Sequence, residues 1–128
     1  MTRSMRAVIV EDNSQMRALI HTVLGSIGFK EIIEAANGEE AIMQIGRSRA
    51  QLVIMDWKMD VMDGLECTRR IRAGTDGIDP KLPIILLTGM TGSDSERAAY
   101  EAGADLFMEK PFSIKKLHAG IEKIIGAT

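Results

Sequence analysis

The feature that most constrains the fold is a regular alternation between short apolar runs and longer segments whose apolar residues recur at helical spacing. The apolar runs are rich in β-branched residues and give way to polar ones, which is typical of strands buried on both faces of a sheet. Alternating strands and helices imply right-handed crossovers and a parallel sheet, a doubly wound α/β fold. We predict strands at residues 7–10, 31–35, 52–55, 83–87 and 105–109, and helices at about residues 14–27, 39–47, 64–73, 93–102 and 113–125.

Local signals mark several helix ends. Asn13 or Ser14 can cap the N-terminus of the first helix, and Gly28 stands where its C-terminal cap is expected. Ser93, followed by Glu96 three residues later, resembles a capping box that opens the fourth helix. The apolar spacing of the last helix predicts an inner stripe of Ile114, Leu117, Ile121 and Ile124.

Length and composition fit one globular domain. The chain has 128 residues, of which 45% are apolar and 27% charged, and its net charge is -2. These values argue against disorder, and the lack of a basic excess argues against direct nucleic-acid binding. Cys67 is the only cysteine, so we expect it as a small, partly buried helix residue in a reducing compartment. No apolar run approaches the length of a membrane span, and we therefore expect a cytoplasmic protein.

Polar side chains stand at the carboxyl ends of four predicted strands, where functional groups collect in sheets of this kind. They are Glu11 and Asp12 after the first strand, Asp56 after the third, Thr88 after the fourth and Lys110 after the fifth. Clustered carboxylates repel one another, and a divalent cation that prefers oxygen ligands, namely Mg²⁺, Mn²⁺ or Ca²⁺, relieves that repulsion. A hydroxyl and an ammonium at the same edge can hold phosphoryl oxygens while Asp56 attacks phosphorus as a nucleophile.

At these positions the sequence resembles bacterial two-component response-regulator receiver domains, of the single-domain type related to chemotaxis regulators. The resemblance extends over about residues 6–125, and it implies a flavodoxin-like fold with five parallel strands and helices on both faces. It depends on four segments in the right order and spacing, at residues 8–13, 56–64, 87–89 and 110–112. We expect residues 1–128 to form one receiver domain without an attached output domain.

The resemblance also implies a role for each site residue. Asp56 would be the phosphoacceptor, and Thr88 and Lys110 would hold the phosphoryl group. Mg²⁺ would be bound by Asp56 and Asp12, by Glu11 through water, and by the backbone carbonyl of Lys58. The peptide bond between Lys110 and Pro111 would be cis.

A switch is implied as well. Thr88 would move toward the phosphoryl group, and Phe107 would turn inward to fill the vacated space, changing the surface of the fourth helix, fifth strand and fifth helix, at about residues 93–125. The phosphodonor would be a histidine kinase or a histidine phosphotransfer protein, and the output protein is not identified. Phosphoryl transfer to Asp56 and its reversal would be self-catalysed, so the chain would not be an enzyme in the usual sense. It would be a monomer or a weak dimer.

Two positions depart from the family pattern, and two others lie where the family tunes its chemistry. Asp60 replaces the usual proline after Met59, which adds a charge beside the acidic pocket. Phe107 replaces a frequent tyrosine, so its ring lacks an outward hydroxyl. Lys58 and Met90 lie at positions that tune the lifetime of the phosphoryl group.

Residues near the predicted site disfavour two other classes of protein. A phosphatase of the haloacid-dehalogenase type needs a second acid two residues after the nucleophile, where this chain has Lys58. A flavodoxin-like cofactor binder needs a phosphate loop where this chain has Glu11 and Asp12, which would repel a phosphate. An interaction module that is never phosphorylated and a relay that passes the phosphoryl group onward remain as alternatives, whereas we do not expect the receiver half of a longer DNA-binding regulator from a sequence of 128 residues.

Overall fold

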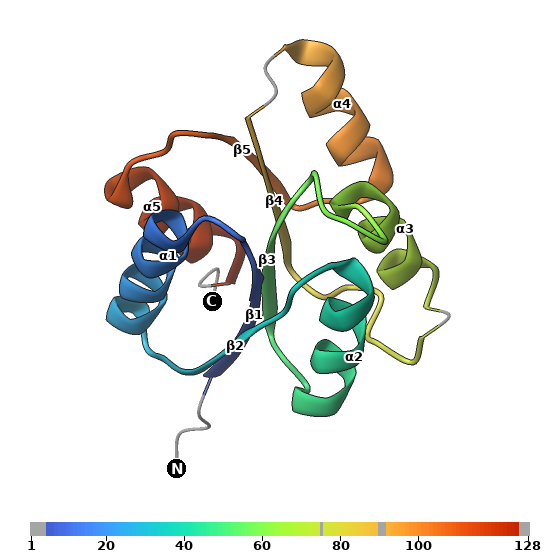
Figure 1. Ribbon diagram of the computed structural model, residues 1–128, viewed down its shortest axis with the longest axis horizontal. Coiled ribbons are helices and arrows are strands. Elements are labelled where there is room, and N and C mark those ends of the chain that lie inside the picture. Colours follow the sequence, from blue (N-terminus) through green and yellow to red (C-terminus); the bar gives the residue numbers. More distant parts are fainter. Residues whose placement is uncertain (1–4, 75, 90–91, 126–128) are drawn as a thin grey trace.

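The computed structural model of the protein describes residues 5–74, 76–89 and 92–125. Within these ranges five parallel strands form one sheet in the order β2-β1-β3-β4-β5, which confirms the predicted fold (Figure 1). The strands are β1 (Met5–Val10), β2 (Phe29–Glu34), β3 (Leu52–Asp56), β4 (Ile84–Thr88) and β5 (Leu106–Glu109). The helices are α1 (Ser14–Ile27), α2 (Gly38–Ser48), α3 (Gly64–Ala73), α4 (Ser93–Ala102) and α5 (Ile114–Ile125).

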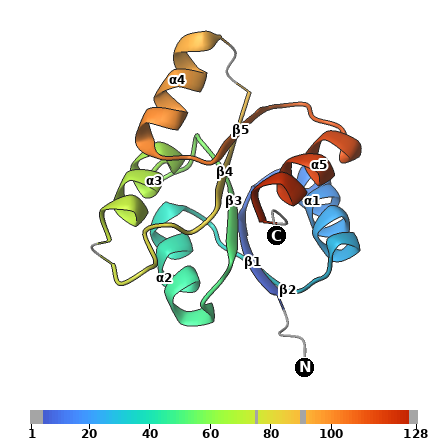
Figure 2. The ribbon, with the colours of Figure 1, turned by 180° about the vertical axis from the view of Figure 1, so that it is seen from behind.

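The helices form a layer on each face of the sheet. Figures 1 and 2 show α1 and α5 side by side on one face, and α2, α3 and α4 on the other. Strands β3 and β4 are buried along their whole length, because each has a strand on either side and a helical layer on each face. None of the helices in the described ranges is long and apolar enough to cross a membrane.

The second strand lies earlier in the sequence than predicted. It spans Phe29–Glu34 instead of residues 31–35, and it pairs with β1 from Met5 opposite Phe29 to Ile9 opposite Glu34. Because β2 is an edge strand of the sheet, the exposed side chains of Lys30 and Glu31 do not interrupt it. Sheet pairing, which extends β1 back to Met5, therefore sets the start of β2 more strongly than its apolar pattern does.

The predicted caps of α1 are confirmed, whereas the predicted cap of α4 is wrong. The Oδ1 atom of Asn13 accepts a hydrogen bond from the backbone N–H of Met16 at 2.9 Å, and Gly28 forms the C-terminal cap. In α4 the N-cap position is occupied by Gly92, and Ser93 is already the first helical residue. Since an N-cap residue has extended backbone angles, Ser93 does not form the expected capping box.

Two predictions about burial also need correction. Ile114, which was expected on the inner stripe of α5, is 53% exposed, and Phe112 just before the helix is buried in its place. Leu117 and Ile121 are fully buried, as predicted. Cys67 is completely rather than partly buried, and burial raises the pKa of its thiol to about 12, so it is an unreactive core residue.

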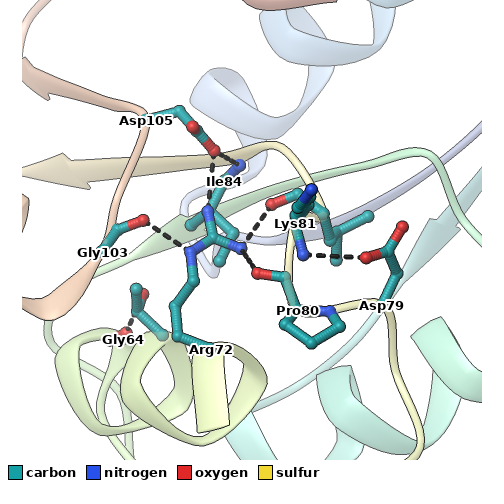
Figure 3. A network of polar contacts seen from close by, with 10 residues as sticks. Gly64, Arg72, Asp79, Pro80, Lys81, Ile84, Gly103 and Asp105 are labelled. Atoms are coloured by element: carbon teal, nitrogen blue, oxygen red, sulfur yellow. Dashed lines mark hydrogen bonds and ion pairs between the residues drawn. The ribbon is translucent and has the colours of Figure 1, made fainter. Parts of the chain in front are cut away.

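A polar network joins three chain segments at the edge of the sheet where β4 and β5 begin. Arg72, near the end of α3, lies at its centre (Figure 3). The guanidinium of Arg72 donates hydrogen bonds to the carbonyl oxygens of Gly103 (2.8 Å), Pro80 (2.7 Å) and Leu82 (2.7 Å) and to the carboxylate of Asp105 (2.8 Å). The Asp105 carboxylate also accepts a hydrogen bond from the backbone N–H of Ile84, the first residue of β4, at 2.8 Å.

Candidate functional site

The structure gathers the predicted site residues at the opposite edge of the sheet, where the strands end. Glu11 directly follows β1, Asp56 is the last residue of β3, Thr88 is the last residue of β4, and Lys110 directly follows β5. Parallel strands bring their carboxyl ends to one edge, so residues far apart in the sequence become neighbours. The peptide bond between Lys110 and Pro111 is cis.

Three carboxylates form the negative part of this site. One carboxylate oxygen from each of Glu11, Asp12 and Asp56 lies within 4.8 Å of the others. Glu11 is 4% exposed and Asp56 is 9% exposed, whereas Asp12 is open to solvent. Hard oxygen donors in a partly open cluster fit Mg²⁺, which keeps some of its water ligands and uses few carboxylates. These three residues could therefore hold such an ion.

Lys110 is the positive partner of the two buried acids. Its Nζ atom lies 2.5 Å from Oδ1 of Asp56 and 2.7 Å from Oε1 of Glu11. Within the described residues, Lys110 is the one polar contact of this Glu11 oxygen, whereas the other carboxylate oxygen accepts a hydrogen bond from the backbone N–H of Asn13 at 3.0 Å. One ammonium thus offsets two buried carboxylates, and their negative charge remains under-compensated.

The pKa values reflect this imbalance. The pKa of Asp56 is raised to about 6, chiefly by burial and also by the negative charge of Glu11, while the hydrogen bond and charge of Lys110 act in the opposite direction. Burial by itself would lower the pKa of Lys110, but the hydrogen bonds and charges of Asp56 and Glu11 outweigh it and raise that pKa overall. Near neutral pH, Asp56 is therefore ionised, and a nearby cation would favour that form.

Two pockets that share lining residues give access to Asp56. A pocket of about 500 Å³ includes the three carboxylates together with Lys58, Met59, Asp60 and Asp63 in its wall. A second pocket, of about 460 Å³, is lined by Asp12, Asp56, Lys58, Thr88, Gly89 and Lys110. Asp56 and Lys58 line both, so a group that enters the pockets can reach the nucleophile from the side of the acids or from the side of Thr88.

Neighbouring residues that the sequence analysis did not single out hold the site in place. Arg17 donates a hydrogen bond from Nη1 to the carbonyl oxygen of Glu11 at 2.9 Å and pairs with Glu34 at 3.5 Å. A side chain at Gly64 would place its Cβ only 2.4 Å from the carbonyl oxygen of Asp56, so this position requires glycine. The sequence gives no signal for Arg17, because an arginine in a helical segment is ordinary. The Asp63-Gly64 pair, in contrast, is a turn signal.

The expected switch residues lie beside the site. Phe107 is 8% exposed, and its ring packs edge to face against Trp57, with the ring centres 6.3 Å apart. Any rearrangement of Phe107 would thus start from a buried ring. Thr88 is buried as well, and Trp57 is partly exposed. Met90, expected to tune the phosphoryl lifetime, lies outside the described residues.

Comparison with sequences of known proteins identifies the relatives of this chain. The family model of the response regulator receiver domain matches residues 7–122. Among curated proteins, the chemotaxis protein CheY1 of Helicobacter pylori is 31% identical over 123 residues, which are 95% of this chain and 98% of that protein. The match thus spans nearly the full length of both chains.

Solved structures give the same result. The chemotaxis protein CheY4 of Vibrio cholerae superposes with a TM-score of 0.82 at 26% identity, covering 96% of this chain and all of that one, 100%. The receiver domain of a sensor histidine kinase from Pseudomonas aeruginosa, solved with a magnesium ion coordinated in its active site cleft, gives a TM-score of 0.81 at 30% identity and covers 98% of this chain and 100% of that one. The chain therefore belongs to the response regulator receiver domain family of two-component signalling.

Proposed function

We propose that the protein is a phosphorylation-dependent switch that accepts a phosphoryl group on Asp56 from a phosphohistidine, with Mg²⁺ bound beside it. The observation that carries this proposal is the environment of Asp56. Its carboxylate is nearly buried, lies 2.5 Å from the ammonium of Lys110, and faces a cluster with two further acids. A carboxylate with a purely structural role would not need to lie in a cluster whose negative charge is under-compensated and which opens into two pockets.

The proposed transfer exchanges one bond for another. A bond forms between phosphorus and an oxygen of Asp56, while the bond between phosphorus and the donor's imidazole nitrogen breaks. The electron pair of the broken bond stays on the imidazole nitrogen, which then takes up a proton. A divalent cation, when bound, supplies positive charge that offsets the charge of the phosphoryl oxygens.

Residues of this chain would hold the incoming group. Lys110 already lies at Asp56, so its ammonium can pass from the carboxylate to a phosphoryl oxygen as the new bond forms. Thr88 lines the same pocket and can donate a hydrogen bond to another phosphoryl oxygen. Glu11, Asp12 and the backbone carbonyl of Lys58 would bind the cation together with Asp56, and Lys58 borders both pockets.

We further propose how the signal would pass through the cell. A histidine kinase or histidine phosphotransfer protein in the cytoplasm would be the donor, and the surface of α4, β5 and α5 would change for an output protein. Phe107 on β5 contacts Trp57, the residue after Asp56, so a change at the nucleophile has a short path to β5. The reaction is self-catalysed transfer and its reversal, which is not the work of an enzyme on a separate substrate.

Fluorescence of Trp57 offers a first test, because this residue is the only tryptophan and follows Asp56 directly. We would titrate the wild type and Asp56→Asn with Mg²⁺ and then add acetyl phosphate. The proposal predicts that the donor causes a second change in the wild type only. Equal changes in both proteins would contradict the role of Asp56, and no donor-dependent change in either would favour an interaction module that is not phosphorylated.

A further inference from the structure

The hydroxyl of Tyr100 covers the free edge of the sheet at Phe107. Among the residues that the structure describes, strand β5 pairs only with β4, so one side of its backbone has no strand partner there. The backbone N–H of Phe107 points to that side and donates a hydrogen bond to the hydroxyl oxygen of Tyr100 at 3.3 Å. Unpaired N–H groups at a sheet edge need a partner, and here a side chain from α4 provides it.

The helix that carries Tyr100 is held mainly at its C-terminal end. Its buried side chains are Ala99 and Ala102, whereas its first turn is largely exposed and begins at a glycine without a capping side chain. Figure 1 shows α4 reaching away from the sheet toward its N-terminal end. At the other end, the carbonyl oxygen of Gly103 accepts a hydrogen bond from Arg72 at 2.8 Å. Small buried alanines offer little area to fix the orientation of a helix, so a directional bond near Ala99 matters more.

We propose that Tyr100 is a positioning residue that fastens α4 to β5 at Phe107, so that a displacement of β5 is passed on to α4. The ring of Phe107 has no hydroxyl, and the polar link to its surroundings therefore runs through its backbone. A hydrogen bond to a backbone N–H holds the strand itself and not only one side chain. The transmission of a signal along this link rests on the proposed function, but the link itself does not.

The link is tested first in the resting protein, by amide hydrogen exchange in the wild type and in Tyr100→Phe. This substitution removes one oxygen and keeps the ring. Loss of one hydrogen bond predicts that the amide of Phe107 exchanges about three- to tenfold faster. The last turn of α4 should exchange faster as well.

Ser26→Ala is the matched control, because it removes a hydroxyl that bonds only within α1, to the carbonyl oxygen of Val23 at 2.8 Å. Exchange at Phe107 should not change in this variant. Unchanged exchange at Phe107 in Tyr100→Phe would overturn the inference. An equal increase in both variants would overturn it too, because the effect would then be general loosening.

Transmission is tested by binding of Mg²⁺ and beryllofluoride, a tetrahedral mimic of the phosphoryl group, with backbone amide shifts as the readout. We expect shifts in both β5 and α4 in the wild type, and in Tyr100→Phe the shifts in α4 should shrink to less than about half while those in β5 persist. Full shifts of α4 in Tyr100→Phe would contradict the coupling. Failure of the proposed function is a different result, namely no mass gain with acetyl phosphate in either protein, and the resting exchange then still decides whether Tyr100 fastens α4.

Discussion

The two edges of the sheet carry polar clusters of similar size but opposite character. At the carboxyl edge, the ammonium of Lys110 faces Glu11 and Asp56, and Asp12 adds a third carboxylate. One positive charge is too little for three acids, Lys110 is the one polar contact of a buried Glu11 oxygen within the described residues, and the pKa of Asp56 is raised to about 6.

At the amino edge, the guanidinium of Arg72 faces a single carboxylate, that of Asp105, and three backbone carbonyl oxygens. Each of these contacts is a hydrogen bond of normal length, and the carboxylate has a second donor in the backbone N–H of Ile84. The geometry suits the planar fork of arginine. Charge and hydrogen bonding are thus balanced at this edge without any added ligand.

This difference in charge compensation distinguishes a structural polar cluster from a functional one. A balanced cluster gains nothing from a ligand, so its role is to fix the connections between elements. An under-compensated cluster gains much from a cation or a phosphoryl group, and it lowers the stability of the protein without them. Removing a charge should therefore have opposite effects on stability at the two edges.

The largest expected effect is at the balanced edge. Arg72→Ala removes four hydrogen bonds and leaves the Asp105 carboxylate without its charged partner, so we expect a loss of about 2–4 kcal/mol in the free energy of unfolding. Denaturant unfolding measures this loss. Arg70→Ala is the control, because Arg70 makes a partly exposed ion pair with one side chain, Asp76, and no backbone contact of the kind that Arg72 makes within the described residues, so it should change stability less. Equal losses in the two variants would show that the Arg72 network has no special weight.

At the acidic edge, Asp56→Asn should stabilise the protein when no divalent cation is present. Because the folded pKa of about 6 lies above the ordinary value of 3.8, ionising Asp56 costs the folded state, and wild-type stability falls as the pH rises from about 4 to 6. The variant escapes this loss, so it should be more stable by on the order of 2 kcal/mol at pH 8, with the difference vanishing near pH 4. Thermal unfolding across this range checks the sign. A destabilised variant at pH 8 would mean that the pair with Lys110 outweighs burial.

Removal of the exposed acid should affect cation binding more than stability. Asp12→Ala takes away one oxygen ligand, and we expect the Mg²⁺ dissociation constant to rise at least about tenfold, or about 1.4 kcal/mol. Titration calorimetry measures it. Asp79→Ala changes a carboxylate outside the acidic cluster and should leave the dissociation constant unaltered, so similar weakening in both would indicate a general charge effect.

The smallest expected effect concerns backbone strain beside the acidic pocket. The backbone angle φ of Val61 is 70°. Across this residue, the backbone N–H of Met62 donates a hydrogen bond to the carbonyl oxygen of Asp60 at 2.7 Å, and the three residues form a γ-turn of the rare and strained form. The Val61 side chain is 75% exposed, so no packing offsets the strain. Val61→Gly should stabilise the protein by about 0.5–1 kcal/mol. Arg49, with φ 56 at the end of α2, is unbranched, so Arg49→Gly should gain less, and the reverse order would refute strain at Val61.

Much of the fold and of the candidate site could be predicted from the sequence, because both depend on local pattern. Apolar runs in the sequence indicate the buried strands. A parallel sheet brings the carboxyl ends of its strands to one edge, so Asp56, Thr88 and Lys110 could be placed together. The network of Arg72 could not be foreseen, since it joins segments that are distant in the sequence. The offset of β2 and the exposure of Ile114 depend on tertiary packing in the same way.

The central claim is that Asp56 itself receives the phosphoryl group, and intact-mass analysis tests it most directly. Wild type, Asp56→Asn and Asp94→Asn, which changes an exposed aspartate of α4, would each be incubated with Mg²⁺ and acetyl phosphate. If Asp56 is the phosphoacceptor, we expect the added mass of one phosphoryl group on the wild type and on Asp94→Asn, and no added mass on Asp56→Asn. Full modification of Asp56→Asn, or an unmodified wild type, would contradict it.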